Sequence, residues 1–133
     1  MPTNLETTEA IYQAFGAGDV PTILSKLAED ITWEHDLVEN YGIPWLAPGT
    51  GIAHVSDFFG VVHKEFEIAS FDVISFLEGN SQVAVVCRMK AKIRLTGKPI
   101  NGLEVHLWTF DRTGKVVRFR HFVDTHQHFH ASR

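Results

Sequence analysis

The pattern of hydrophobic and polar positions divides the chain into a helical first half and a strand-rich second half. Apolar residues recur at helical spacing over about 5–17 and again over 20–27. Between these segments, Gly18 suits a helix end, Asp19 is a good N-cap and Pro21 favours a first helical turn. The chain is therefore predicted to open with a helical hairpin.

A short strand, a loop and a third helix are predicted next. The strand covers 30–36, and the loop covers 40–50, which is rich in glycine and proline. This loop also carries apolar side chains, and apolar loop residues usually fold back over a core or a pocket. The third helix begins at Ile52, where apolar residues recur with helical spacing.

The rest of the chain alternates apolar and polar residues, as strands do. Strands are predicted over 66–77, 82–95, 100–110 and 116–124. Short turns join them, so they are expected to form an antiparallel meander. Helices followed by such strands predict an α+β fold, with three N-terminal helices packed on one face of the sheet. Because no linker, repeat or low-complexity tract interrupts the pattern, 1–133 is predicted to be a single domain.

Composition and charge exclude several classes of function. The 133-residue chain has a formal net charge of −4 and no large Lys/Arg cluster, which disfavours nucleic acid and anionic membranes as partners. No apolar stretch approaches the roughly 20 residues of a membrane span, and no signal peptide pattern is present, so a cytoplasmic location is expected. The single cysteine, Cys87, lies in an apolar strand pattern and is interpreted as a buried small hydrophobe.

Several stretches of local sequence carry a family resemblance. AGD at 17–19 leads to LAEDITW at 27–33, and TGKP stands at 96–99. The most specific stretch is VHLWTF at 105–110, followed by GKVVRFR at 114–120 and DT at 124–125. Together they resemble the SnoaL-like branch of the NTF2-like superfamily, which includes ketosteroid isomerases and polyketide cyclases. The resemblance implies an NTF2-like cone with a strongly curved antiparallel sheet, a small-molecule pocket and a homodimer, and it indicates the reaction only weakly.

The resemblance also places candidate catalytic residues. Ketosteroid isomerases use a carboxylate to shuttle a proton and a carboxylic acid to stabilise an oxyanion, and His35 and His106 stand at the equivalent places here. The third isomerase element, a tyrosine on the first helix, falls on Ile11, with Tyr12 one residue further along. Because all three positions are changed, steroid isomerisation by the usual residues is not expected.

Each candidate has a catalytic and a structural interpretation. His35 can act as a base, since an unperturbed imidazole has a pKa of about 6.5, or can be hydrogen-bonded inside the rim of the sheet. His106 can donate its N–H to a developing enolate, or be a satisfied core group. Asp124 stands where the resemblance to SnoaL-like cyclases implies an acid/base aspartate, and the alternative is an ion pair with a nearby arginine.

Ligand-binding residues are expected to be mainly aromatic. The predicted pocket walls are Tyr12, Phe15, Trp33, Trp45, Phe58, Phe59, Trp108, Phe119 and His121. At the end of the chain, histidines alternate at 126, 128 and 130 within a predicted flexible tail, 126–133. Adventitious metal binding or no role is expected for that tail, so no metal site and no cofactor are predicted.

These observations favour an enzyme-like pocket protein that binds a small apolar, ketone- or polyketide-like molecule. Cofactor-free acid–base chemistry of an isomerase, cyclase or lyase/hydrolase is expected, with His106 donating to a carbonyl while His35 or Asp124 moves the proton. The alternative is a non-catalytic ligand carrier or protein-interaction module. The alternating basic residues over 88–94 fit a partner-facing sheet surface, and a pocket filled by tryptophan side chains would favour this alternative.

Overall fold

The computed structural model describes residues 1–35 and 40–133. Its helices are α1 (Asn4–Gly16), α2 (Val20–Ser25), α3 (Ile52–Glu65) and α4 (Thr125–Ala131), with a short 3-10 helix, η1 (Pro44–Leu46). Its strands are β1 (Leu27–His35), β2 (Gly49–Thr50), β3 (Phe66–Gly79), β4 (Gln82–Ile93), β5 (Pro99–Phe110) and β6 (Val116–Phe122). The strand predicted over 30–36 corresponds to β1, except that Asp36 lies outside the described residues.

The described strands form one six-stranded sheet in the order β2-β1-β6-β5-β4-β3. Strands β3 to β6 are the predicted antiparallel meander, since each pairs with the next along the chain. Strand β1 instead runs parallel to β6, on the far side of the meander from β3. The α+β class and the curved sheet are therefore confirmed, and β1 extends the sheet by a parallel pairing between distant segments.

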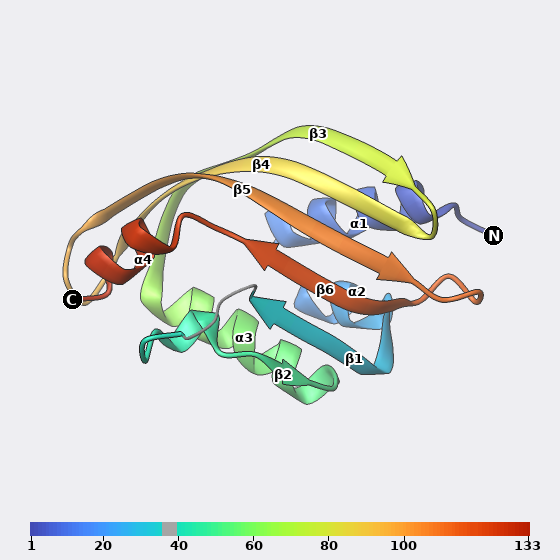
Figure 1. Cartoon of the computed structure of the whole chain (residues 1–133), viewed down its shortest axis with the longest axis horizontal. Helices are drawn as coiled ribbons and strands as arrows, with labels where there is room; N and C mark the ends of the chain where they lie inside the picture. The colour runs from blue at the N-terminus through green and yellow to red at the C-terminus, as the bar shows by residue number, and fades with distance from the viewer. Residues whose placement is uncertain (36–39) are drawn as a thin grey trace.

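Curvature of the sheet creates room on one side for the helices. The pairing of β3 with β4 shifts register twice, between Ile68 and Ser70 and between Val73 and Ser75, and such bulges bend strands. In Figure 1 the long strands arch over the helices, with α4 near one end of the sheet. The main core joins residues of α1, α2 and α3 to the concave face of the sheet.

The predicted helical hairpin is present, with the expected joint. Gly18 has a φ of +70°, a conformation that glycine adopts without strain, between α1 and α2. The carboxylate of Asp19 accepts a hydrogen bond from the backbone N–H of Thr22 at 3.1 Å, so it caps α2. This joint places the inner face of α1, with Ile11, against the sheet.

The C-terminal segment differs from the flexible tail expected over 126–133. It folds as α4, because the Asp124 carboxylate caps its N-terminus and its last turn docks on the sheet side. His128 and Ala131 are buried, and the Thr96 hydroxyl donates to the carbonyl oxygen of Ala131 at 2.6 Å. A helix turns alternate residues to different sides, so His128 points inward whereas its two neighbouring histidines are exposed.

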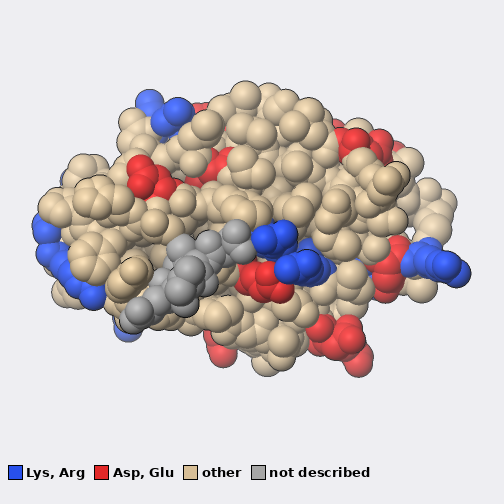
Figure 2. Space-filling view, in the orientation of Figure 1, with Lys and Arg blue, Asp and Glu red and all other residues tan. Residues whose placement is uncertain are grey.

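Charged side chains on the face shown in Figure 2 lie in small separate groups, some of a single sign and some in which both signs meet. One such group joins β6 to β1, where Arg118 donates to the Glu34 carboxylate at 2.9 Å. Among the described residues, no helix is long and apolar enough to cross a membrane. The homodimer and the cytoplasmic location stay predictions.

Candidate functional site

A cavity lies between the concave face of the sheet and α1 and α3. Its volume is about 70 Å³, which is large enough to hold more than one water molecule. Every residue predicted as a pocket wall lines it, namely Tyr12, Phe15, Trp33, Trp45, Phe58, Phe59, Trp108, Phe119 and His121. The tryptophan side chains therefore line the space without filling it.

Aromatic packing makes the floor of the cavity rigid. Trp33 of β1 lies opposite Phe119 of β6 in the parallel register, and their rings stack with centroids 3.9 Å apart. Trp108 of β5 lies opposite Phe119 on its other side, with ring centroids 4.5 Å apart. Phe58 of α3 covers Trp33 from the helix side. Interlocked rings of this kind hold their orientation, so polar groups beside them are held in place as well.

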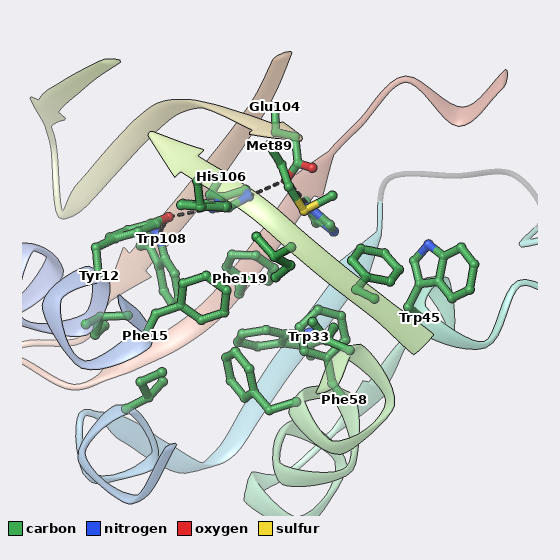
Figure 3. A pocket seen from close by; sticks show the side chains of 18 of the residues that line it. Tyr12, Phe15, Trp33, Trp45, Phe58, Met89, Glu104, His106, Trp108 and Phe119 are labelled. Atoms are coloured by element: carbon green, nitrogen blue, oxygen red, sulfur yellow. Dashed lines mark hydrogen bonds and ion pairs between the residues drawn. The ribbon is translucent and has the colours of Figure 1, made fainter. Parts of the chain in front are cut away.

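The register of the sheet also places three histidines in one row. His106 of β5 lies opposite His121 of β6, which in turn lies opposite His35 of β1. Glu104 stands two residues before His106 on β5 and points to the same face, because side chains alternate along a strand. The Glu104 Oε1 atom lies 2.9 Å from Nε2 of His106 and 2.9 Å from Nε2 of His121. Figure 3 shows Glu104 and His106 on the cavity wall.

Glu104 is the anionic centre of this network. It is 3% exposed, and its Oε2 atom has no hydrogen-bond partner among the described residues. Burial raises the pKa of Glu104, but hydrogen bonds from His106 and His121 outweigh burial and hold that pKa below its ordinary value. A carboxylate accepts hydrogen bonds and donates none, so both histidines donate from Nε2.

Proton positions in the rest of the network follow from that assignment. In a neutral imidazole that donates from Nε2, the Nδ1 atom is an acceptor. The Tyr12 hydroxyl therefore donates to Nδ1 of His106, and the Trp108 indole N–H donates to the Tyr12 oxygen at 3.0 Å. Figure 3 shows Tyr12, His106 and Glu104 linked in this order. The result is a continuous hydrogen-bonded chain along the cavity wall.

Burial keeps the acid and base groups of this chain neutral. It lowers the pKa of His106, although the hydrogen bond to Glu104 opposes this effect. It raises the pKa of Tyr12 well above 10, although the hydrogen bond from Trp108 opposes this effect. Tyr12 is therefore a phenol that donates, and His106 is an imidazole whose Nδ1 can take up a proton.

His35 lies behind the wall rather than on it. Its Nδ1 atom is 2.9 Å from Nδ1 of His121, and with His121 as acceptor His35 donates. Its Nε2 atom is buried and has no hydrogen-bond partner among the described residues. Burial, reinforced by the neighbouring His121, lowers the pKa of His35 to about 2. His35 does not line the cavity, so its place is that of a support for His121 rather than a base in contact with a ligand.

Asp124 does not join the site, which corrects the expectation for this residue. It is exposed and does not line the cavity. Its carboxylate accepts from the side-chain and backbone N–H groups of Gln127, and these hydrogen bonds lower its pKa. The strand β6 ends at Phe122, so the chain has already turned away from the sheet face at Asp124. Asp124 is a helix cap.

Replacement of Asp124 by Ala is expected to lower the free energy of unfolding by about 1 kcal/mol, because α4 loses its N-cap. Urea denaturation measures this change. Asp124→Asn keeps an oxygen at the capping position and is the matched control, with a smaller expected loss. Equal losses for the two variants would show that the cap is not the source of the effect.

The family of the chain follows from a comparison with family models, in which the SnoaL-like domain model matches residues 8–119. The chain belongs to the SnoaL-like domain family. This SnoaL-like domain is accordingly a member of the NTF2-like superfamily, and it contains Tyr12, Glu104 and His106 within the matched residues.

Solved structures of the same fold match almost the whole SnoaL-like domain. An NTF2-like protein from Burkholderia thailandensis E264 superposes with a TM-score of 0.87 at 24% identity, covering 100% of this chain and 99% of that chain. An NTF2-like protein of unknown function from Burkholderia pseudomallei K96243 gives 0.81 at 27% identity, covering 98% of each chain. TerC, co-crystallised with polyporic acid, gives 0.77 at 26% identity, covering 97% of each chain. A comparison with curated protein sequences finds no match.

Several lining residues of this SnoaL-like domain were missed by sequence reasoning. Glu104 is the most important, and its signal was available, because it stands two residues before His106 on the same strand face. His128 lines the cavity and accepts from the Trp45 indole N–H at 2.8 Å. The sequence pattern predicts a flexible tail over 126–133 and therefore no pocket residue there, whereas the structure has α4. Burial lowers the pKa of His128 to about 4.

Proposed function

We propose that this SnoaL-like domain binds a small apolar, ketone-like molecule and moves a proton on it without a cofactor. The observation that carries this proposal is the buried chain Trp108–Tyr12–His106–Glu104 along an apolar cavity. Along this chain of hydrogen bonds, Tyr12 is a neutral donor, His106 is a neutral acceptor and Glu104 is an anion. General acid–base catalysis needs these elements, held by positioned side chains.

The hydrogen bonds of each group define its role in the proposed proton transfer. A carbonyl oxygen of the ligand accepts from the Tyr12 hydroxyl, whose own oxygen is held by Trp108. With that hydroxyl turned to the ligand, Nδ1 of His106 is free to take the proton from the adjacent carbon. The C–H electron pair becomes the C=C bond of an enolate, and the negative charge goes to the oxygen. Glu104 stabilises the imidazolium that forms, as a carboxylate does in a Ser-His-Asp triad.

The cavity also suggests which ligands fit. Its walls are almost entirely aromatic and aliphatic, which favours a small, largely apolar ring. A groove lined by residues of α1, α3 and β3 shares Phe15, Phe59 and Phe71 with the cavity, so larger ligands can extend into it. The similarity to TerC, which was co-crystallised with polyporic acid, supports a small-molecule ligand.

Proton abstraction can be tested before the natural ligand is known. The protein is incubated with a panel of cyclic ketones in deuterated buffer, and loss of the signals of the α-protons is followed by proton NMR. Acceleration of exchange for at least one ketone is expected. The Tyr12→Phe variant is expected to exchange about 10²–10³-fold more slowly, because one oxyanion donor is lost. Asp124→Ala is the control that keeps the wild-type rate per folded molecule.

A non-catalytic ligand carrier is the second candidate. The mutual hydrogen bonds of Glu104, His106 and His121 favour it, because they hold both imidazoles on one carboxylate oxygen as a structural core network would. The same ketone panel separates the two functions. A carrier raises its melting temperature with a ligand but exchanges no protons, and that result would overturn the catalytic proposal.

A further inference from the structure

A sulfur atom, an imidazole nitrogen and a carboxylate meet at one point beside the cavity. Cys87 of β4 lies opposite Glu104 of β5, and His106 follows Glu104 on the same face. The ligand atoms of these three buried side chains all lie within 4.8 Å of one another. Nε2 of His106 is 3.8 Å from the Cys87 sulfur and 2.9 Å from Oε1 of Glu104.

This combination of donor atoms is the one that zinc prefers. Zn²⁺ binds thiolate sulfur at about 2.3 Å and imidazole or carboxylate at about 2.0–2.2 Å, in tetrahedral geometry. Two donors on one ion then lie roughly 3.3–3.6 Å apart. The two separations from Nε2 of His106 bracket this range, so small side-chain rotations would bring the three atoms to bonding distance. Hard cations such as Mg²⁺ take oxygen ligands instead.

Two further observations point to a cation at this place. The first is the Oε2 atom of Glu104, a buried carboxylate oxygen with no hydrogen-bond partner among the described residues. The second is Tyr12, whose hydroxyl contacts Nδ1 of His106 and which Trp108 holds in turn. A histidine that binds a metal through one nitrogen typically donates its other N–H to an oxygen, and the Tyr12 oxygen is in place to accept once the direction of this hydrogen bond reverses.

We propose that Cys87, Glu104 and His106 form a binding site for Zn²⁺, which reaches them through the cavity that Glu104 and His106 line. On binding, the Cys87 thiol releases its proton to solvent, and the proton of His106 moves from Nε2 to Nδ1, where it is donated to the Tyr12 oxygen. One thiolate and one carboxylate balance the charge of the ion, so the buried complex is electrically neutral. Three protein ligands would leave one of four tetrahedral positions open for a water molecule or another ligand.

This inference goes beyond the proposed acid–base function and does not rest on it. The metal-bound and acid–base forms are mutually exclusive states of the same side chains, because the bound ion leaves Nδ1 of His106 protonated. Zn²⁺ is therefore expected to inhibit any proton transfer that uses His106. The metal site itself is tested by binding alone, whether or not a ketone ever exchanges.

The test first removes a competing site. His126 and His130 are exposed and four residues apart on α4, an arrangement that binds metals on helix surfaces. The full chain carrying His126→Ala and His130→Ala is therefore the background protein. It is titrated with Zn²⁺ by calorimetry and with Co²⁺ by absorbance. One ion per chain is expected, with the near-ultraviolet charge-transfer band of a cobalt–thiolate bond, and no binding of Mg²⁺.

Variants of the thiol decide the outcome. Cys87→Ser and Cys87→Ala are expected to abolish the charge-transfer band and to weaken Zn²⁺ binding by at least about 100-fold, since losing even an outer partner of a metal ligand costs about 10–100-fold. Near-ultraviolet circular dichroism checks that each variant is folded. One folded variant is enough to test whether Cys87 binds the ion. Zn²⁺ binding that keeps its affinity in that variant, or Co²⁺ binding without the band, overturns the proposal.

Discussion

Replacement of Glu104 by Gln is expected to slow ketone α-proton exchange by about 10²–10³-fold, because the imidazolium that forms on His106 loses the attraction of a neighbouring anion, up to about 4 kcal/mol at a separation of about 4 Å. The Glu104 carboxylate accepts from Nε2 of both His106 and His121. Both imidazoles donate to Oε1, and Oε2 has no hydrogen-bond partner among the described residues, so a glutamine can keep both hydrogen bonds through its carbonyl oxygen. The glutamine carries no charge, however, so the imidazolium that forms on His106 loses its counter-charge. The exchange rate in deuterated buffer, measured by NMR, checks this.

A matched control separates this effect from a general loss of charge. Glu34 of β1 is the partner of Arg118 outside the cavity, and Glu34→Gln is expected to exchange at the wild-type rate. Rates are compared per folded molecule, because Glu104→Gln also disturbs a buried network. A Glu104→Gln protein that exchanges within a few-fold of wild type would show that the anion has no part in the reaction.

Local sequence patterns predicted the strands that have one buried face and one more exposed face. The alternation over 82–95 corresponds to β4, in which Val83, Val85 and Cys87 are buried while Lys90 and Lys92 are exposed. The same alternation in β5 places His106 and Trp108 inward. Such a pattern depends only on which side chains are buried, and the alternation of apolar and polar residues over a short stretch of sequence indicates this directly.

The site itself depends on contacts between distant segments, which no local pattern records. His35 meets His121 because β1 runs parallel to β6, across a separation of 86 residues. Tyr12 meets His106 across 94 residues, by the packing of α1 on the sheet. His35 and His106 could therefore be named as candidates from the sequence, but the predicted cavity position of His35 is wrong, because His35 lies beyond His121 in the row and does not line the cavity. It also left Glu104 without a role, because its significance comes from the two imidazoles that face it.

Buried neutral histidines couple the stability of this domain to pH. Burial lowers the pKa of His35 to about 2 and that of His128 to about 4. In the unfolded chain, both titrate near 6.5. Above that pH both states are neutral, and stability does not depend on these groups. As the pH falls below 6.5, the unfolded chain binds protons that the native protein excludes, so the free energy of unfolding falls.

Lowering the pH from 7.5 to 5.0 is therefore expected to reduce the free energy of unfolding by at least about 4 kcal/mol, with about 2 kcal/mol from each of His35 and His128 at 1.36 kcal/mol per pKa unit. His106, whose pKa is also lowered by burial, adds to this loss. At pH 5.0 the carboxylates still contribute little, because Glu104 begins to lose its stabilising hydrogen bonds only below the ordinary pKa of 4.5. Urea denaturation at the two pH values measures the change. His128→Gln is expected to make this loss smaller by about 2 kcal/mol, because glutamine can still accept from Trp45 but does not titrate. His63→Gln, at an exposed position of α3, is expected to leave it unchanged. A wild-type change below about 1 kcal/mol would mean that the buried imidazoles take up protons without unfolding.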